Sequence, residues 1–226
     1  MTPIPNGLCV VLGAGGHARV ILDILLSAHP PVPCALLEAD SSRWGSAMMG
    51  VPILGGDDLL PALAQKGVRH FVVGAASVGN SRLRSRLFEY AAALGLEPLP
   101  VIHARAALSS WARIGPGVQL FAHSVVNPGA VLGVNIVVNT GAIVEHDCQI
   151  EDHAQIATGA RLCGAVRVGK GAYIGAGSVV RQGIAIGQAA CVGAGSVVVR
   201  DVAPETTVAG VPAALLKNRA CSPSSE

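Results

Sequence analysis

The sequence predicts a chain of two parts. An α/β domain of the half-Rossmann (βαβαβ) type occupies residues 1–102, and an all-β parallel helix of hexapeptide repeats, a solenoid, occupies residues 103–216. Three observations predict this. Aliphatic residues return every six positions from Leu108 onward, a glycine-rich turn follows an apolar segment near the N-terminus, and 28 glycines accompany 51% hydrophobic but 3% aromatic residues. So few aromatic residues favour a repetitive core of small and aliphatic side chains.

The N-terminal domain begins with an apolar strand over residues 8–12, which runs directly into the glycine turn of residues 13–18. The other elements that we expect are a helix over residues 20–26, a strand over 34–37, a helix capped by Asp57, a strand over 69–74 and a helix over 81–94. Strands and helices that alternate in this way form a small parallel sheet. The domain is too short for a full dinucleotide-binding fold.

The glycine turn, Gly13-Ala14-Gly15-Gly16-His17-Ala18, suits an anion. Its bare amides lie at the N-terminus of a helix, where phosphate groups bind. Glu38 and Asp40 follow some twenty residues later, where an acidic side chain accepts hydrogen bonds from ribose. The same turn also serves as a tight strand-to-helix connection without any ligand. If it binds one, the small domain favours a nucleotide-linked sugar over NAD.

The second half of the chain has a strict period of six. The aliphatic series is Leu108, Ile114, Leu120, Val126, Leu132, Val138, Val144, Ile150, Ile156, Leu162, Val168, Ile174, Val180, Ile186, Val192 and Val198. A small or β-branched residue commonly stands four positions later, and Gly, Asn or Asp often stands directly after the aliphatic residue. Neither a helix nor a hairpin has this period. Three short strands joined by tight turns would close a coil of eighteen residues, with the aliphatic side chains in the axis and Gly or Asn at turns that need a positive φ.

The segment Val11–Ala18, fused to this solenoid, resembles the family of sialic-acid O-acetyltransferases and amino-sugar N-acetyltransferases, which includes the bacillosamine and perosamine enzymes. The resemblance extends over residues 8–215 and includes the terminator at 208–213. It implies a left-handed coil, a homotrimer with active sites between neighbouring helices, acetyl-CoA as co-substrate and a nucleotide-linked sugar as acceptor. We expect residues 217–226 to form a disordered tail.

The resemblance also implies roles for individual residues. It places the sugar nucleotide at Gly15, Gly16 and His17, with Glu38 nearby and with Ala76, Ser77 and Gly79 lining the same pocket. It places acetyl-CoA along Ala176 and Ala194, where small side chains leave room for the pantetheine arm. Gln155 stands nine residues after His146, where the family usually has a second histidine that contacts the acetyl group. Either the Gln155 amide or His153 could take that role.

His146 and Asp147 are the expected catalytic pair. His146 follows a core residue by two positions, so it projects outward, and a histidine suits the removal of a proton from a nucleophile at neutral pH. Asp147 offers the carboxylate that fixes the tautomer of the imidazole and raises its basicity. Asn139 is expected to orient the substrate. Gly164 lies eighteen residues after His146, one coil further on, where its N–H suits the thioester carbonyl.

These residues favour an acetyl-CoA-dependent acetyltransferase that N-acetylates a nucleotide-linked amino sugar in bacterial surface-glycan biosynthesis. O-acetylation of a sugar is the first alternative, and a non-catalytic solenoid that binds sugar nucleotides is another. A zinc-dependent carbonic anhydrase of the γ type also uses this solenoid. However, the histidines of this chain lack the zinc-binding spacing of that class. The sequence leaves open the sugar and the base of the nucleotide.

Composition excludes several other classes. The formal net charge of +2 without a basic cluster disfavours nucleic acid as a partner. The uncharged stretch 114–144 is interrupted by asparagines, prolines and glycines, which disfavours membrane insertion. The six cysteines form no CxxC pair, so we expect neither a metal site nor a disulfide framework. With no cleavable leader at the N-terminus, we expect a cytoplasmic protein.

Overall fold

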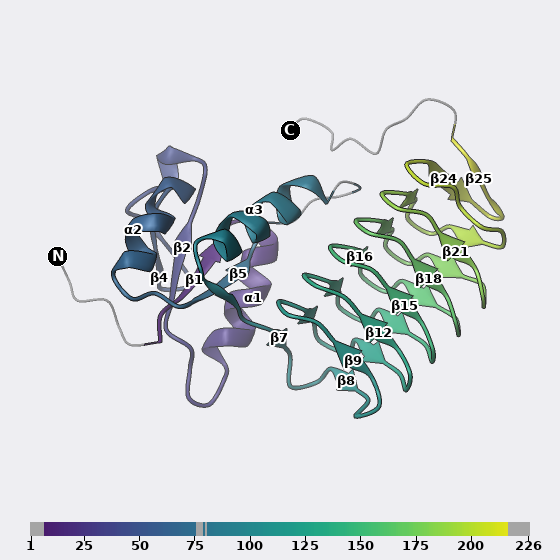
Figure 1. Cartoon of the computed structure of the whole chain (residues 1–226), viewed down its shortest axis with the longest axis horizontal. Helices are drawn as coiled ribbons and strands as arrows, with labels where there is room; N and C mark the ends of the chain where they lie inside the picture. The colour runs from purple at the N-terminus through teal and green to yellow at the C-terminus, as the bar shows by residue number, and fades with distance from the viewer. Residues whose placement is uncertain (1–6, 76–78, 80, 217–226) are drawn as a thin grey trace. The chain divides into compact units, whose positions relative to one another are not determined.

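The computed structural model describes residues 7–75, 79 and 81–216 and contains two compact units (Figure 1). The first unit runs to residue 76 and resumes over residues 86–101. The second unit joins residues 77–85 to the chain from residue 102 onward. The grouping of residues 77–85 with the second unit has no counterpart in the sequence pattern. The predicted tail at 217–226 lies outside the described residues.

The first unit is an α/β sheet of six strands in the order β3-β4-β2-β1-β5-β6. Its strands are β1 (Cys9–Leu12), β2 (Cys34–Leu37), β3 (Ala47–Met48), β4 (Val51–Gly55), β5 (His70–Val73) and β6 (Glu97–Pro98). Its helices are α1 (Gly16–Leu26), η1 (Ser41–Arg43), η2 (Asp57–Leu59), α2 (Leu60–Gln65) and, from residue 86 onward, α3 (Arg82–Ala93), whose first residues group with the second unit. All neighbouring strands are parallel except β3 and β4, which form an antiparallel pair.

Burial explains the elements of this unit. Strand β1 is central and all four of its residues are fully buried, as expected for a parallel strand covered on both faces. Helix α1 buries Ala18, Ile21, Leu22 and Leu25, which recur at helical spacing on one face. Asp57 does not cap a helix as predicted: it lies within η2, and the cap residue Gly56 has no side chain to offer.

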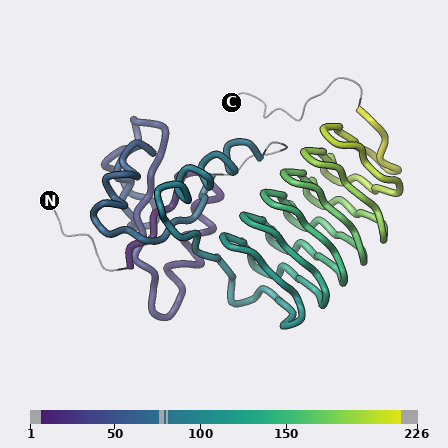
Figure 2. The backbone as a smooth tube through the Cα atoms, in the orientation of Figure 1, coloured from purple at the N-terminus to yellow at the C-terminus, as the bar shows by residue number. Residues whose placement is uncertain are grey.

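The second unit is a parallel β-helix whose coils stack on one another (Figure 2), and its strands have two residues each except β24 and β25. Its first face comprises β7 (Val101–Ile102), β10 (Gln119–Leu120), β13 (Val137–Val138), β16 (Gln155–Ile156), β19 (Tyr173–Ile174), β22 (Cys191–Val192), β24 (Thr207–Gly210) and β25 (Ala213–Leu215). The second face comprises β8 (Ala107–Leu108), β11 (Val125–Val126), β14 (Ile143–Val144), β17 (Arg161–Leu162), β20 (Val179–Val180) and β23 (Val197–Val198). The third face comprises β9 (Arg113–Ile114), β12 (Val131–Leu132), β15 (Gln149–Ile150), β18 (Arg167–Val168) and β21 (Ala185–Ile186).

The register confirms a coil of eighteen residues. Val126 pairs with Val144, which pairs with Leu162, and the same step continues through Val180 to Val198. These aliphatic side chains are at most 1% exposed and belong to one continuous axial core. Such a core is assembled from contacts between neighbouring coils only. The antiparallel pair β24–β25 completes the last coil.

We name the turns of the β-helix by the strands that they follow. The first, second and third edges are the turns that follow strands of the first, second and third faces. From the turn after Ile114 to the turn after Val192, the positive φ falls on the third residue after the aliphatic one, as in Asn135 (56°), Asp147 (60°) and Gly159 (67°). The glycines directly after the aliphatic residues have another purpose. A Cβ on Gly169 would lie 2.6 Å from the backbone N of Gln188 in the next coil, so these glycines permit close stacking. Among the described residues, no helix is long and apolar enough to cross a membrane.

Candidate active site

His146 and Asp147 form a hydrogen-bonded pair on the second edge. The Nδ1 of His146 lies 2.8 Å from Oδ2 of Asp147, and both side chains are more than half exposed. An ionised carboxylate only accepts hydrogen bonds, so Nδ1 carries the proton and Nε2 presents a lone pair. Asp147 adopts φ = 60°, which aspartate tolerates better than most side chains do. The pair has the arrangement of a general base with its orienting group.

Two glycines make room for this pair, one coil on each side. A Cβ on Gly164 would lie 2.5 Å from Nε2 of His146, so the imidazole occupies the space that a side chain at residue 164 would need. A Cβ on Gly129 would likewise collide with Oδ1 of Asp147. Gly164 was expected from the coil length. Gly129, which our reading of the sequence missed, could have been found by subtracting eighteen from Asp147.

The backbone of Gly164 suits an electrophile beside the imidazole. Its carbonyl accepts a hydrogen bond from the N–H of Gly183. Within the described part of the chain, the Gly164 N–H donates to no backbone carbonyl. Nε2 of His146 therefore lies next to Gly164 of the adjoining coil, whose N–H has no backbone acceptor in the described structure. A base and an oxyanion donor in this arrangement fit acyl transfer.

Asn127 and Glu145 stiffen the same turn and were not anticipated from the sequence. Nδ2 of Asn127 donates to Oε2 of Glu145 over 2.8 Å, across one coil step. Glu145 directly precedes His146, so this bond fixes the start of the turn that carries the imidazole. The only sequence signal was the eighteen-residue spacing of the two side chains.

Cys148 is close to the pair but is not a nucleophile. Burial raises the pKa of its thiol to about 11, and its Sγ donates to the carbonyl oxygen of Cys163 over 3.3 Å. A thiol with this pKa remains protonated at neutral pH, and the thiol form is a poor nucleophile. Cys148 instead fills the small inward position of its repeat.

The structure does not bring the other expected cofactor residues to His146. Ala176 and Ala194 share the first edge with Asn139, whose Oδ1 accepts the N–H of Thr140 over 2.7 Å. Ala176 and Ala194 are exposed and one coil apart, as the spacing indicates. However, the second face separates this edge from the second edge with His146 and Gly164. Gly164 and Ala176 are twelve positions apart, which is two thirds of a coil, so they do not share a ladder within one chain.

Gln155 is separated from His146 by half a coil. It lies on the first face, is 7% exposed, and its Nε2 has no hydrogen-bond partner in the described part of the structure. His153 lies on the third edge and is buried, with Nδ1 3.0 Å from Nδ2 of Asn135. Nη2 of the buried Arg84 donates to Oδ1 of Asn135 over 2.9 Å. This orients the Asn135 amide, so that its Nδ2 donates to His153. His153 is thus part of a buried structural network.

The histidines of the β-helix do not converge on a metal site. His123, His146 and His153 stand on the first, second and third edges respectively. Over the described ranges, no group of three or more His, Cys, Asp or Glu side chains could hold a metal ion.

In the first unit, the glycine turn is open as expected. A Cβ on Gly15 or Gly16 would meet no atom within 4 Å, and both residues are exposed at the start of α1. Glu38 lies beside this turn: its Oε2 accepts the N–H of Ala14 over 2.8 Å and pairs with Nη1 of Arg43 at 3.2 Å. His17 is partly buried in the first turn of α1. The turn therefore offers free space over helix N-terminal amides, next to a held carboxylate.

The third expected segment is described only at Gly79, which adopts φ = 70° and groups with the second unit. Ala76 and Ser77, which were expected to line the same pocket, lie outside the described residues. Their role stays a prediction.

Comparisons with known proteins agree with this architecture. Residues 9–91 match the family model described as the PglD N-terminal domain. A GDP-perosamine N-acetyltransferase of Escherichia coli O157:H7 is 30% identical over 175 residues, which cover 76% of this chain and 77% of that protein.

Solved structures are similar over almost the whole chain. A variant of the perosamine N-acetyltransferase from Caulobacter crescentus, in complex with CoA and GDP-perosamine, has a TM-score of 0.88 and 35% identity, covering 95% of this chain and 99% of its own. The acetyltransferase domain of PglB from Neisseria gonorrhoeae in complex with acetyl coenzyme A has a TM-score of 0.85 and 36% identity, covering 94% and 100%.

Proposed function

Because the chain belongs to the PglD-like family of hexapeptide-repeat sugar acetyltransferases, it is an acetyl-CoA-dependent enzyme that N-acetylates a nucleotide-linked amino sugar, and we propose that this acceptor is a GDP-linked amino sugar. The names of the E. coli and C. crescentus relatives support GDP as the nucleotide. The left-handed β-helix carries the chemistry. The observation on which the mechanism rests is the His146–Asp147 pair held between Gly129 and Gly164.

The reaction that this pair supports is direct acyl transfer. The amino nitrogen of the sugar attacks the carbonyl carbon of the thioester while Nε2 of His146 takes a proton from that nitrogen. Asp147 stabilises the imidazolium that forms. The N–H of Gly164 donates to the oxyanion of the tetrahedral intermediate. Collapse of the intermediate breaks the carbon–sulfur bond, and the imidazolium returns the proton to the departing CoA thiolate.

We propose a homotrimer with active sites between chains. Within one chain, the Ala176–Ala194 ladder and the His146 edge lie on opposite sides of the second face. The outward side chains of that face are mostly apolar: Val125, Ile143, Val179 and Val197 are partly buried, while Ala107 and the charged Arg161 are exposed. A face of this kind marks a protein–protein contact. A neighbouring copy would cover it and set its own first edge, with Asn139, against His146. Gln155 could serve the cofactor only from such a neighbour, and only if its amide became accessible.

The nucleotide half of the acceptor is assigned to the first unit. The open amides of Gly15 and Gly16 suit its diphosphate, and the carboxylate of Glu38 suits ribose hydroxyls. Both lie at the carboxyl ends of parallel strands, where open α/β sheets bind their ligands. We place the reaction in the cytoplasm, where acetyl-CoA and nucleotide-linked sugars are available.

The test is a panel of nucleotide-linked sugars incubated with the enzyme and acetyl-CoA. Mass spectrometry should detect the gain of one acetyl group on a GDP-linked amino sugar. The product should resist mild alkaline hydroxylamine, which removes esters and leaves amides. An acetyl group that hydroxylamine releases would establish O-acetylation instead. Absence of any acetylated product with the GDP-linked amino sugars of the panel would contradict the proposed acceptor.

A further inference from the structure

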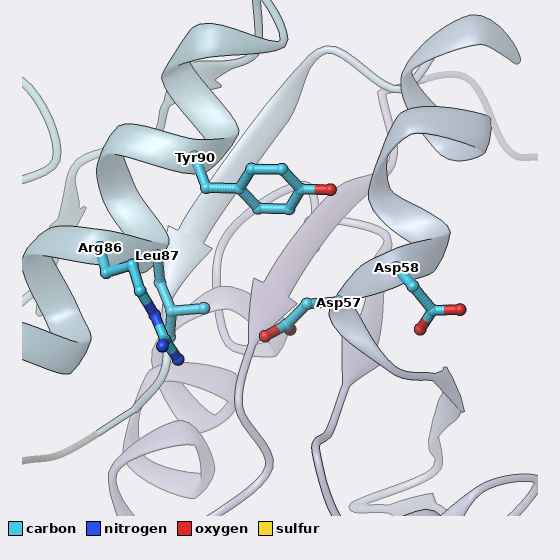
Figure 3. A pocket seen from close by; sticks show the side chains of 5 residues that line it. All are labelled: Asp57, Asp58, Arg86, Leu87 and Tyr90. Atoms are coloured by element: carbon cyan, nitrogen blue, oxygen red, sulfur yellow. The ribbon is translucent and has the colours of Figure 1, made fainter.

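The first unit has a cavity of about 370 Å³ between the start of η2 and helix α3. Asp57, Asp58, Arg86, Leu87 and Tyr90 line it. Figure 3 shows the Tyr90 ring and the Leu87 side chain reaching from α3 toward η2. The Asp57 carboxylate points toward α3, whereas the Asp58 carboxylate points away from it. The mechanism described above uses none of these five residues.

The place of the cavity in the sheet connects it to the nucleotide elements. Strands β4, β2 and β1 are neighbours in this order, and all three are parallel. Their carboxyl ends carry, respectively, Asp57, Glu38 and the open glycine turn. Ligands of open α/β sheets extend across such strand ends. A nucleotide with its diphosphate at Gly15 and its ribose at Glu38 would therefore extend its base toward Asp57.

The charge interactions of Asp57 indicate that its carboxyl lies near the expected position of the nucleotide. Burial raises the pKa of the Asp57 carboxyl, the charge of Arg86 opposes that rise, and the negative charges of Glu38 and Asp58 add to it. Asp57 is therefore within electrostatic range of the carboxylate that we assign to ribose. It is also partly buried, so a hydrogen-bonding ligand has less hydration to displace from it than from an exposed carboxylate.

The chemistry of the cavity distinguishes between bases. Tyr90 and Leu87 offer an aromatic and an aliphatic wall for a flat ring, and stacking on such a wall does not depend on the base. The Asp57 carboxylate accepts hydrogen bonds and cannot donate them. Guanine presents two adjacent donors, N1–H and the N2 amino group, which a carboxylate can accept together. Uracil presents one N–H between two carbonyl oxygens, and the carboxylate would repel these oxygens. Adenine has an acceptor nitrogen beside its amino group.

We infer that Asp57 binds the guanine base of the sugar nucleotide through N1–H and the N2 amino group, in the cavity that Leu87 and Tyr90 help to line. This inference rests on the proposed nucleotide-linked substrate and adds the residue that selects its base. The positive charge of Arg86 opposes the rise in the pKa of Asp57 that burial causes, and so favours the ionised carboxylate that this role needs.

The experiment measures calorimetric binding of GDP, UDP, ADP and xanthosine diphosphate, without sugar or acetyl-CoA. The proteins are the wild-type enzyme, Asp57→Asn and the matched control Asp58→Asn. The wild-type enzyme should bind GDP at least ~100-fold more tightly than the other three, since a site built for N–H donors rejects ligands that lack them. Asp57→Asn should lose roughly 100-fold in GDP affinity and gain affinity for xanthosine diphosphate, because the Asn amide can donate to the O2 of xanthine. Asp58→Asn should keep the preference for GDP.

The gain of xanthosine diphosphate binding shows that Asp57→Asn is folded, so misfolding cannot imitate the expected result. Asp57→Asn that still prefers GDP to xanthosine diphosphate would overturn the inference. Wild-type enzyme that binds UDP as tightly as GDP would do the same. Neither result affects acetyl transfer, which is assayed separately with amino-sugar nucleotides. An enzyme that reads GDP through Asp57 but acetylates none of them would instead refute the proposed function alone.

Discussion

At the scale of single residues, the site depends on two glycines, which have no side chain, as much as on His146 and Asp147. The imidazole of His146 and the carboxylate of Asp147 occupy the space that side chains at Gly164 and Gly129 would fill. The pair is exposed, so its orientation comes from the hydrogen bond between its members and from these two neighbours. The catalytic arrangement therefore extends over three successive coils.

Replacement of His146 tests the general base. His146→Ala should lower kcat by roughly 10²–10⁴, the usual contribution of a positioned base. Calorimetric affinity for acetyl-CoA should change little, because His146 is assigned to proton transfer and not to holding the cofactor. Asp147→Asn should give a smaller loss, since the imidazole remains but is less well oriented. A His146→Ala enzyme with near-normal kcat would remove His146 as the base.

Replacement of Gly164 tests the space around the imidazole. The added methyl group of Gly164→Ala would lie 2.5 Å from Nε2 of His146, so the ring must rotate away from Asp147. We expect kcat to fall by about 10²-fold or more, because a misplaced catalytic group loses its alignment with the substrate. Cys163→Ala, one residue earlier in the same turn, is the matched control and should keep most of the activity. Equal activity of Gly164→Ala and wild-type enzyme would show that the imidazole does not need this position.

At the scale of elements, the solenoid could be predicted and the sheet of the first unit only in part. The period of six is kept in every coil because side chains at equivalent positions of the repeats have the same surroundings. The antiparallel pair β3–β4 was missed: β3 has two residues, and β4 contains Pro52, which argues against a strand. The burial of Arg84 against Asn135 depends on residues 51 positions apart, and no local pattern reports such a contact.

The candidate site, like the fold, could be predicted from the sequence only in part. The eighteen-residue period predicts that Gly164 lies next to His146, and the structure has it there. Arithmetic on the same period would also have put Ala176 on a different edge. That separation agrees with the expectation of sites between neighbouring chains, and the roles of Ala176 and Ala194 stay predictions.

Two substitutions in the glycine turn of the first unit should have different effects, one on the stability of the fold and the other on the binding of the nucleotide. A Cβ on Gly13, at φ = 102°, would lie 2.9 Å from the backbone N of Ala75, whereas one on Gly15 would meet nothing. Gly13→Ala should therefore lower the free energy of unfolding by about 1–3 kcal/mol, measured by urea denaturation. Gly15→Val should leave that free energy within about 1 kcal/mol of the wild-type value and raise KM for the sugar nucleotide far more than KM for acetyl-CoA. If Gly15→Val changed both KM values equally, the turn would not be a separate nucleotide site.

At the scale of the whole molecule, the positions of the edges support the proposed trimer. His146 lies on the second edge and the exposed alanines Ala176 and Ala194 on the first, with the mostly apolar second face between them. Light scattering should accordingly give three times the chain mass of 22.8 kDa. A monomer that retains full activity would contradict shared sites.

Mixed trimers give a sharper test. His146→Ala and Ala176→Trp should each be inactive alone, the second because the indole blocks the cofactor ladder. Co-expressed in equal amounts, they should recover about a quarter of the wild-type activity, since a site that draws on two chains pairs two intact contributions in about one case in four. If each site instead used both edges of one chain, every site would carry one defect and no activity would return.

The coil length also limits how this protein can change in evolution. A deletion of six residues between His146 and Gly164 would preserve the aliphatic core but would move every later residue to the preceding face, so that Gly164 would leave the edge of His146. A change of eighteen residues preserves both core and faces and alters only the number of coils. We therefore expect homologues to differ in solenoid length by whole coils. Gaps of six or twelve residues should be selected against between the turn of His146 and the coil that carries Gly164. Selection on this gene should therefore preserve the eighteen-residue period as well as the identity of the core residues.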